Sequence, residues 1–530
     1  MKVFSLFQFL ALLLLFLVIS TPTNAQSDSK NKKSSWRKSY KEGLAAYSNH
    51  EYAKATALLK EAAAAKPRHI PTAYQAGLAS FYYRDYANAK KFLLDVQRSK
   101  KSKEKYPLAA YYYGVALKCS GEYAAAMKTL DDFVATYAYD DTYYNNALGH
   151  LAGCSYALNV APRNKQATGV ENMGMSVNTP DSEQSAGNIS PDKMLFTTTN
   201  ENKVEIKIAD KSGKVTLIKA NGLSNNLRVG SLTMASNNKT YFTASNGKFK
   251  QIYEATLIDG SLTDIKPCGA NINGKDNANT QDPFITVNER GQETMFFASD
   301  RAGTRGGLDL WVVVNIPGGG WTIPKNLGDQ INGKSDEIAP FFDKNTKKIY
   351  YSTNRPETIG GFDVYSALGF ARFWNKPSNM SMPINSPADD YYFRLDAESK
   401  KGIVSSNRAG SQTMNVQGAT DDMYAIAMQA DVVQKVTTAD VTKFKVNGSV
   451  MDKFTRNELK GFQISLFQVI DGSPVLVDRS RSDSGYDFTL DKDKVYVIEA
   501  ETDDIRIETF LIDPTDYTDT ELTRDILVAR

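Results

Sequence analysis

Cysteine is scarce in this sequence of 530 residues, which contains three. An odd and sparse count excludes a scaffold built on disulfides. We expect Cys119, Cys154 and Cys268 to be small buried side chains. The alternative is a Cys119–Cys154 disulfide, which an oxidising compartment permits.

Motifs of known catalytic chemistry are also missing. His50, His69 and His150 fall in the first third of the chain and lack the spacing of metal ligands. The rest of the chain therefore has no base for a Ser-His-Asp triad. It also has no Gly-x-Ser-x-Gly elbow and no phosphate-binding loop. We expect no catalytic residue, no metal site and no cofactor, and we predict that the chain is not an enzyme.

Charge of one sign is not in excess, because 63 Lys and Arg face 60 Asp and Glu, a formal charge of +3. This balance does not suggest a nucleic-acid partner. The basic stretches Lys30–Lys41 and Arg98–Lys105 are expected to be solvated helix faces. A hydrophobic content of 42% is enough for several cores, and the length favours about three or four domains.

One long hydrophobic run is present, in residues 1–25. Val3–Ser20 carries no charge, and Thr23-Asn24-Ala25 precedes Gln26 as in a cleaved secretory signal. A membrane anchor is the alternative, since about 18 apolar residues just span a bilayer. We expect an exported protein of the periplasm or the outer-membrane periphery that is not integral to the membrane after cleavage.

A repeat of small residues and tyrosines runs through residues 34–160. Its units are separated by 34 and then 37 residues: Gly43, Tyr52, Ala55; Gly77, Tyr86, Ala89; Gly114, Tyr123, Ala126. Small residues let paired helices approach closely, and the pattern resembles the tetratricopeptide repeat. The resemblance implies an array of helix hairpins, and residues 142–158 are expected to form a further helix that covers its end.

Aromatic and apolar residues at one offset in this repeat predict a partner-binding groove. Tyrosine offers a large contact area with a polar tip. The alternative is packing between repeats. The residues are Tyr40, Leu44, Tyr74, Leu78, Tyr111 and Val115.

A second repeat, of about fifty residues, spans residues 170–430. An apolar strand runs into Ser or Thr and then Asn or Asp at Phe196–Asn200, Phe242–Asn246, Phe296–Asp300, Tyr350–Asn354 and Ile403–Asn407. This period is typical of a propeller blade. We expect a β-propeller of five blades, with a sixth hidden by divergence or built from the ends.

Polar residues recur at fixed places in these units. Four units have an apolar-Asn turn, at Asn178, Asn273, Asn332 and Asn385, and three place Arg301, Arg355 or Arg408 after the strand-end marker. Two then continue with Gly-Gly-x-Asp. The pattern resembles the WD-like repeats of TolB-type propellers. Repetition favours caps of turns and an arginine paired with a neighbouring blade's acid over a catalytic or calcium site. The adjacent carboxylates Asp389-Asp390 are expected to diverge.

Apolar and polar residues alternate from about Phe444 onward, and period two predicts a small antiparallel β-sandwich over residues 443–530. The runs Val446–Asp452, Leu459–Gly461 and Ser484–Phe488 resemble the carboxypeptidase-regulatory-like, transthyretin-like fold. That fold implies no peptidase chemistry.

The predicted fold class is therefore multidomain α + β: a helical tetratricopeptide-repeat array, a five- or six-bladed β-propeller and a transthyretin-like sandwich. This order resembles envelope proteins associated with type IX secretion and gliding, which are OmpA-family relatives. The resemblance implies partners among the proteins of a periplasmic or outer-membrane complex. The chain stops at Arg530, so we expect no OmpA-like peptidoglycan-binding domain.

Two functions follow from this organisation. The main prediction is a non-enzymatic periplasmic scaffold that docks envelope proteins. The alternative is a glycan- or peptide-binding receptor, or a cryptic hydrolase, that uses the propeller face. Its candidate ligand residues are Trp321 and Trp374, unless these pack against outer strands.

Overall fold

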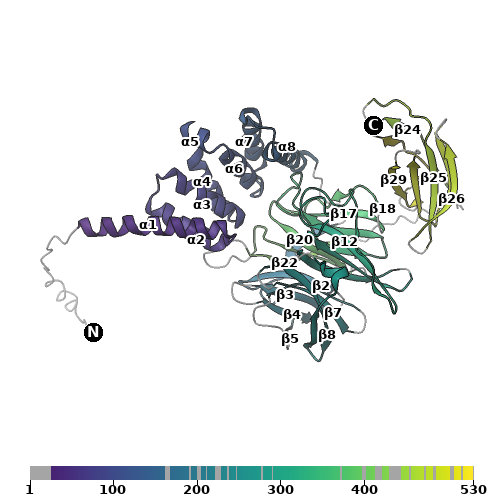
Figure 1. Cartoon of the computed structure of the whole chain (residues 1–530), viewed down its shortest axis with the longest axis horizontal. Coiled ribbons are helices and arrows are strands. Elements are labelled where there is room, and N and C mark those ends of the chain that lie inside the picture. The colour runs from purple at the N-terminus through teal and green to yellow at the C-terminus, as the bar shows by residue number, and fades with distance from the viewer. Residues whose placement is uncertain are drawn as a thin grey trace, which may run out of the picture.

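The computed structural model describes residues 25–528 apart from short internal segments, and these residues form three successive parts (Figure 1). The predicted signal segment and most of the predicted linker at 161–168 lie outside the described residues. None of the described helices is long and apolar enough to cross a membrane. The internal segments left out are 99, 161–166, 190–192, 200–203, 211, 221–227, 236–237, 246–247, 276–277, 289, 371–372, 397–400, 412–419, 429–442, 453–454, 471–472, 482–484, 502–505, 515–516 and 518.

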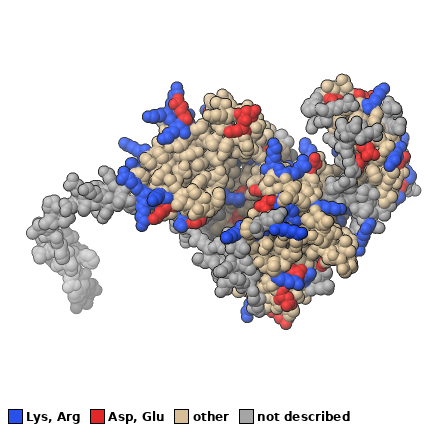
Figure 2. Space-filling view, in the orientation of Figure 1, with Lys and Arg blue, Asp and Glu red and all other residues tan. Residues whose placement is uncertain are grey.

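Helices make up the first part. They are α1 (Ala25–Ser48), α2 (Tyr52–Ala65), α3 (Ile70–Tyr82), α4 (Tyr86–Gln97), α5 (Lys100–Lys105), α6 (Leu108–Lys118), α7 (Tyr123–Thr136) and α8 (Thr142–Ser155), followed by a π-helical turn at Tyr156–Val160. Lysines project from α5, none of whose residues is buried (Figure 2). This basic stretch is therefore a solvated face, as predicted.

Three helix pairs share the same close contact between a glycine and a leucine. A Cβ added at the glycine would lie 2.7 Å from the Cγ of a leucine on the second helix, in the pairs Gly43–Leu59, Gly77–Leu93 and Gly114–Leu130. The turns between the paired helices hold a residue with positive φ at His50, Arg84 and Gly121. Both sets follow the 34- and 37-residue spacing of the sequence repeat. Membership of the tetratricopeptide family stays a prediction.

Five blades form the second part, and their inner strands meet in a closed ring; the first two blades are joined edge to edge, so the five blades make four sheets. Each inner strand contacts the next, and the last contacts the first. The propeller predicted from the sequence is thereby confirmed, with five blades in the part of the chain that the structure describes. The inner strands are β2 (Ser182–Ile189), β6 (Arg228–Met234), β10 (Thr280–Val287), β15 (Glu337–Asp343) and β20 (Asp390–Asp396).

The other strands extend each blade outward by antiparallel pairing. They are β3 (Lys193–Thr199), β4 (Val204–Asp210) and β5 (Val215–Ala220); β7 (Lys239–Ser245), β8 (Lys250–Ile258) and β9 (Ser261–Pro267); β11 (Glu293–Ser299), β12 (Asp309–Ile316), β13 (Gly320–Trp321) and β14 (Lys325–Asn326); β16 (Lys348–Thr353), β17 (Asp363–Phe370), β18 (Phe373–Trp374) and β19 (Ser378–Asn379); β21 (Lys401–Ser406) and β22 (Asp422–Met428). The fourth strand of the last blade is β1 (Ala167–Asn172), which pairs with β22. The ends of the propeller sequence thus complete the fifth blade, and no sixth blade is needed.

The turn asparagines join one blade to the next. Each accepts the backbone N–H of a residue in the third strand of the preceding blade and donates to the C=O of the same residue, at distances of 2.7–3.0 Å. The pairs are Asn178–Met423, Asn273–Ile252, Asn332–Leu310 and Asn385–Val364. We call this contact the asparagine clamp. All four asparagines are buried, and Asn178 closes the ring.

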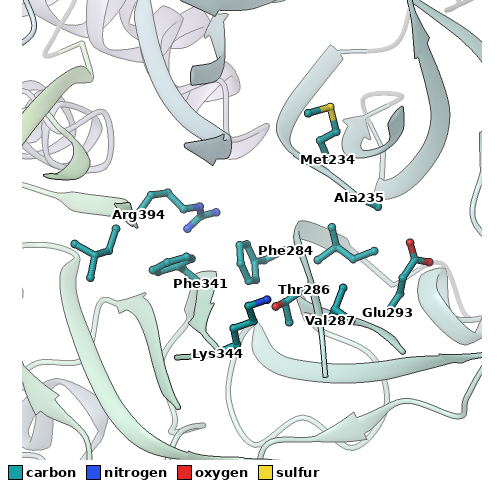
Figure 3. A pocket seen from close by; sticks show the side chains of 11 residues that line it. Met234, Ala235, Phe284, Thr286, Val287, Glu293, Phe341, Lys344 and Arg394 are labelled. Atoms are coloured by element: carbon teal, nitrogen blue, oxygen red, sulfur yellow. The ribbon is translucent and has the colours of Figure 1, made fainter. Parts of the chain in front are cut away.

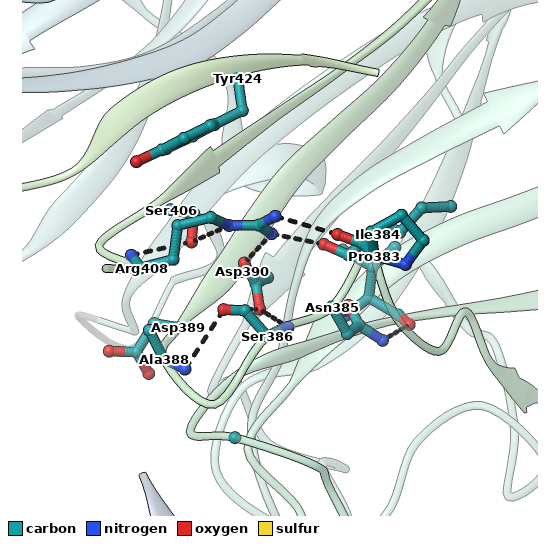
Figure 4. Close-up of polar contacts among 12 residues, drawn as sticks. Pro383, Ile384, Asn385, Ser386, Ala388, Asp389, Asp390, Ser406, Arg408 and Tyr424 are labelled. Atoms are coloured by element: carbon teal, nitrogen blue, oxygen red, sulfur yellow. Dashed lines mark hydrogen bonds and ion pairs between the residues drawn. The ribbon is translucent and has the colours of Figure 1, made fainter. Parts of the chain in front are cut away.

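The repeated arginines brace the same turns. Their guanidinium groups donate to the carbonyl oxygens of Ile272, Ile331 and Ile384, one residue before each asparagine. Arg408 also pairs with Asp390 at 2.5 Å (Figure 4), and Arg355 pairs with Glu337 at 3.3 Å. Both acids begin the inner strand of the same blade. The expectation of a neighbouring blade's acid is wrong, because the arginine follows the second strand and reaches the inner strand beside it.

A β-sandwich forms the third part. Its strands are β23 (Lys443–Gly448), β24 (Val450–Asp452), β25 (Gln463–Ile470), β26 (Ser473–Arg481), β27 (Tyr486–Asp491), β28 (Tyr496–Glu501), β29 (Arg506–Ile512), β30 (Glu521–Thr523) and β31 (Ile526–Val528). Alternate residues such as Tyr486, Phe488 and Leu490 are buried, as their period predicts. The sheet is not wholly antiparallel, since β30 and β31 pair parallel to β23 and β24.

The helical part rests on the propeller face at which the inner strands begin. Lys118 at the end of α6 is fully buried and donates to the Pro356 carbonyl at 2.9 Å and to Thr358 Oγ1 at 3.1 Å. Helix α8 packs on the same loop, where a Cβ at Gly153 would lie 2.4 Å from the Thr358 carbonyl oxygen. Helix α8 therefore does more than cover the end of the helical stack, because it also seats that stack on the propeller.

We predict that Asn178→Ala lowers the free energy of unfolding by about 1–3 kcal/mol, because it leaves the buried Met423 N–H without an acceptor. Urea denaturation measures the change. Asn345→Ala, at an exposed loop residue, is the matched control and should cost less than about 0.5 kcal/mol. Equal losses in the two variants would contradict a special role for the clamp.

A pH dependence follows from His150, whose Nδ1 lies 3.3 Å from Lys118 Nζ. Burial and then Lys118 hold the pKa of His150 well below its ordinary 6.5. Below about pH 6.5 the unfolded chain therefore binds a proton at His150, whereas the folded chain does not. The stability of the wild type relative to His150→Asn should fall by up to about 1.4 kcal/mol per pH unit below that value. A difference that stays constant from pH 7.5 to 5.5 would count against this account.

Candidate binding site at the helix-facing mouth of the propeller

Every inner strand carries a bulge at one level of the central channel. The register with the second strand shifts between Ser185/Ile189, Val229/Leu232, Gln281/Phe284, Ile338/Phe341 and Tyr391/Arg394. In three strands the bulge holds a non-glycine residue with positive φ, at Asp282, Ala339 and Tyr392. Such backbone is uncommon and costs free energy. Bulges re-aim side chains, here toward the channel.

Asp282 closes the channel at this level. Its Oδ1 accepts from the hydroxyls of Ser231 at 2.7 Å and Tyr392 at 2.8 Å. Its Oδ2 accepts from the Gln281 side chain at 2.9 Å and from the Ala339 N–H at 3.3 Å. Burial and then the Asp282 charge raise the pKa of Tyr392 well above 10, so the phenol stays a donor. One carboxylate thus joins four inner strands.

Two cavities result, one at each mouth of the channel. The helix-side cavity has a volume of ≈ 700 Å³, within the roughly 300–1,000 Å³ of small-molecule sites. All five blades line it, and the helical part adds Arg84. Its lining includes Gln184, Ser231, Lys250, Gln281, Asp282, Asp336, Ile338, Phe362, Tyr391, Tyr392 and Asp421.

The lining differs from blade to blade, unlike the frame. Gln281, Ile338 and Tyr391 pair with Ala298, Ser352 and Ser405 and hold the same position in three blades. They are an amide, an aliphatic side chain and a phenol. By contrast, the clamp residue that precedes the inner strand is asparagine in each of these three blades. The cavity is therefore built once, on a frame that is built repeatedly.

Arg84 forms one wall of the cavity. Its Nη1 donates to Asp389 Oδ2 at 2.6 Å and to the Tyr391 hydroxyl at 3.1 Å. Tyr391 in turn donates to Asp421 Oδ1 at 2.7 Å. The Arg84 guanidinium also lies 5.5 Å from the centre of the Phe362 ring. Burial raises the pKa of Asp421, although its bond to Tyr391 and the Arg84 charge oppose the rise.

The polar groups of the opposite wall are already oriented. Lys250 Nζ donates to Gln281 Oε1 at 2.8 Å, which fixes the amide whose NH₂ group donates to Asp282. A ligand would thus meet side chains held in place by their neighbours. Such order lowers the entropic cost of binding.

The predicted groove residues lie within the helical part. Tyr111, Leu78 and Val115 are buried, and the Tyr111 hydroxyl lies 3.2 Å from His150 Nε2. Tyr40, Leu44 and Tyr74 are half-buried, and Tyr74 packs against the ring of Tyr106. None of these six described residues lines the helix-side cavity. Their part in partner binding stays a prediction.

The predicted ligand tryptophans pack among outer strands. Trp374 is buried in the core around β17, and Trp321 lies edge-on to Tyr241 with ring centres 6.0 Å apart. Neither lines the helix-side cavity. The three cysteines are buried free thiols, so Cys119 and Cys154 are not bonded to each other.

Sequence reasoning missed the cavity residues but anticipated one feature beside them. Asp389 and Asp390 do diverge, since Asp389 faces Arg84 and Asp390 faces Arg408. Within the described residues, no group of three His, Cys, Asp or Glu is placed to hold a metal ion. The signal that could have located the cavity is the variation at one strand position among otherwise repeated blades.

Several solved structures are similar to part of this chain. No protein-family model and no curated protein matches the chain. Similar solved structures include a thermostable family-43 glycoside hydrolase (12% identity, covering 48% of this chain and 91% of that one, TM-score 0.35). They also include the Bacteroides ovatus xyloglucan PUL GH43B (11%, 65% and 91%, 0.33) and the PQQ-bound aldose sugar dehydrogenase of Streptomyces coelicolor (10%, 51% and 100%, 0.31).

These comparisons contradict the prediction of a non-enzymatic scaffold and the expectation that the chain is not an enzyme. The three structures named above are of two glycoside hydrolases and a sugar dehydrogenase, which agree with the alternative, a glycan-binding or hydrolytic propeller face, rather than with a scaffold. At 10–12% identity and TM-scores of 0.31–0.35 the likeness assigns no function to this chain. What this chain does has to be argued from its own residues.

Proposed function

We propose that this chain binds a neutral carbohydrate in the helix-side cavity. The observation that carries the proposal is that the lining is built once. Residues that only hold blades together recur from blade to blade, whereas Gln281, Ile338 and Tyr391 do not. Variation at one level of a repeated frame is what recognition of one ligand requires.

The charges of the cavity favour a neutral ligand rich in hydroxyl groups. Three lining carboxylates, on Asp282, Asp336 and Asp421, face two cations, on Arg84 and Lys250. Arg84 is already paired with Asp389. An anion would therefore be disfavoured, whereas sugar hydroxyls both donate and accept and suit carboxylates, amides and an ammonium group alike.

Aromatic groups complete the match. The rings of Phe362 and Tyr391 line the cavity and lie 6.0 Å apart, edge to face. Aromatic rings offer an apolar surface beside polar groups, which suits the C–H face of a sugar ring. Phe362 is also held by its N–H, which donates to Asp389 Oδ1 at 2.9 Å.

The test is binding by the full chain, first on a glycan array and then by isothermal titration calorimetry with the best glycan. We expect Gln184→Ala and Phe362→Leu each to weaken binding about tenfold, which corresponds to about 1.4 kcal/mol. Trp321→Phe is the control, because Trp321 lies outside the cavity, and it should bind as the wild type does. Absence of any bound glycan, or wild-type affinity in both cavity variants, would refute the proposal.

A second candidate is hydrolysis of the bound glycan, favoured by the pair Asp389 and Asp421. Asp389 is paired with Arg84, whereas burial raises the pKa of Asp421, and the two carboxylates are linked through Arg84 and the Tyr391 hydroxyl. Paired carboxylates in unlike surroundings are how glycosidases divide the roles of base and acid. Asp421 would then be the proton donor.

We predict that Asp421→Asn lowers release of reducing sugar at least about a hundredfold, because a general acid contributes roughly 10²–10⁴-fold. Binding should persist. The activity of the wild type should fall as pH rises through the raised pKa of Asp421, since the acid form is then lost. Asp329→Asn, at an exposed residue, is the control. Equal rates in the two variants would exclude Asp421 as the acid.

We also propose that the chain is exported and associates with envelope proteins. The support is the composition of residues 1–25 and the resemblance of the three parts to tetratricopeptide repeats, TolB-type blades and the carboxypeptidase-regulatory-like fold. The repeated Gly–Leu contacts of the helix pairs are compatible with the first of these resemblances.

A further inference from the structure

A second cavity, at the far mouth of the channel, contains a buried arginine. We call it the far-side cavity; its volume is ≈ 400 Å³. Arg394, on β20, is 2% exposed and extends toward Phe341 and Phe284 (Figure 3). Its guanidinium lies 5.4 Å from the centre of the Phe284 ring and 5.7 Å from that of Phe341.

This guanidinium forms no ion pair within the part of the chain that the structure describes, although the charge of Asp282 acts on it and opposes the lowering of its pKa. Its Nη1 donates to the Phe393 carbonyl at 2.9 Å, and its buried Nε has no partner there. Burial lowers the pKa of Arg394 to about 10. The blade arginines Arg355 and Arg408 differ, because each pairs with a carboxylate.

An unpaired buried cation is unfavourable, and the two flanking rings offset the cost in part. The charged groups that face the cavity are Arg394, Lys344 and Glu293. Lys344 is exposed at the rim, and Glu293 accepts a hydrogen bond from Asn315 at 3.0 Å. The lining thus holds two cations and one carboxylate, and the charge of Asp282 acts on Arg394 from outside the lining. The remaining walls include the apolar side chains of Met234, Ile285 and Val287.

We infer that the far-side cavity binds a small organic carboxylate with an apolar body, and that Arg394 is the group that pairs with the carboxylate. A guanidinium presents two parallel N–H donors that match the two carboxylate oxygens. The apolar body packs between Phe284, Phe341 and the aliphatic walls. Lys344 attracts the anion from the rim. The inference does not rest on the carbohydrate proposal, because the two cavities share no lining residue.

Benzoate is the probe, and benzamide, of the same shape without the charge, is its matched control. We expect benzoate to raise the melting temperature of the full chain and to bind in calorimetry with an affinity that falls as salt is added. Benzamide at equal concentration should give at least a tenfold weaker signal. Equal effects of the two probes would overturn the inference, as would tighter binding of inorganic phosphate than of benzoate.

Two variants locate the site. Arg394→Met should abolish benzoate binding and leave the melting temperature of the ligand-free chain unchanged or higher, because an apolar side chain replaces an unpaired buried charge. Lys344→Gln, at the exposed rim, should fold normally and weaken benzoate binding a few-fold at low salt. Unchanged affinity in Lys344→Gln, or benzoate binding retained by Arg394→Met, would overturn the assignment even if one variant were unstable.

Discussion

Closure of the ring is the constraint on which the rest of this structure depends. A single blade leaves apolar faces open, and only a complete ring covers them. Here the last blade is completed by residues that precede the first, because β1 supplies its fourth strand and Asn178 clamps its third. The clamp spans 245 residues of chain. A contact of such separation must first offset the entropy of closing the loop, which slows folding.

The frame could be predicted from the sequence because its parts repeat. Asn332 precedes Asn354 by the same interval that separates Asn385 from Asn407, and each first asparagine proved to be a clamp. The direction of the arginine contacts could not be predicted, since it depends on which strand lies beside the second strand. Parallel pairing of β30 with β23 was missed for a similar reason, because period two reports burial but not strand direction.

The candidate site could not be predicted, because its residues look ordinary in sequence. Gln281 and Tyr391 lie in strands whose alternation of apolar and polar residues does not mark them out. They line the cavity beside a bulge that the sequence does not reveal. Arg84 belongs to a turn between helices 305 residues away from Asp389. Only docking of the helical part on the propeller brings them together. That docking depends on Gly153 and the buried Lys118, neither of which has a recognisable motif.

Asp282 combines a left-handed backbone with a place in the lining of the helix-side cavity. The left-handed backbone at Asp282, Ala339 and Tyr392 would be unfavourable in an isolated strand, and it persists because the surrounding ring leaves no alternative. In return the carboxylate of Asp282 collects donors from three other inner strands and seals the channel. A movement of any of these strands must disturb a hydrogen bond to Asp282. Asp282 lines the helix-side cavity and precedes Phe284 of the far-side cavity by two residues, so its fixed position orders the chain beside both linings.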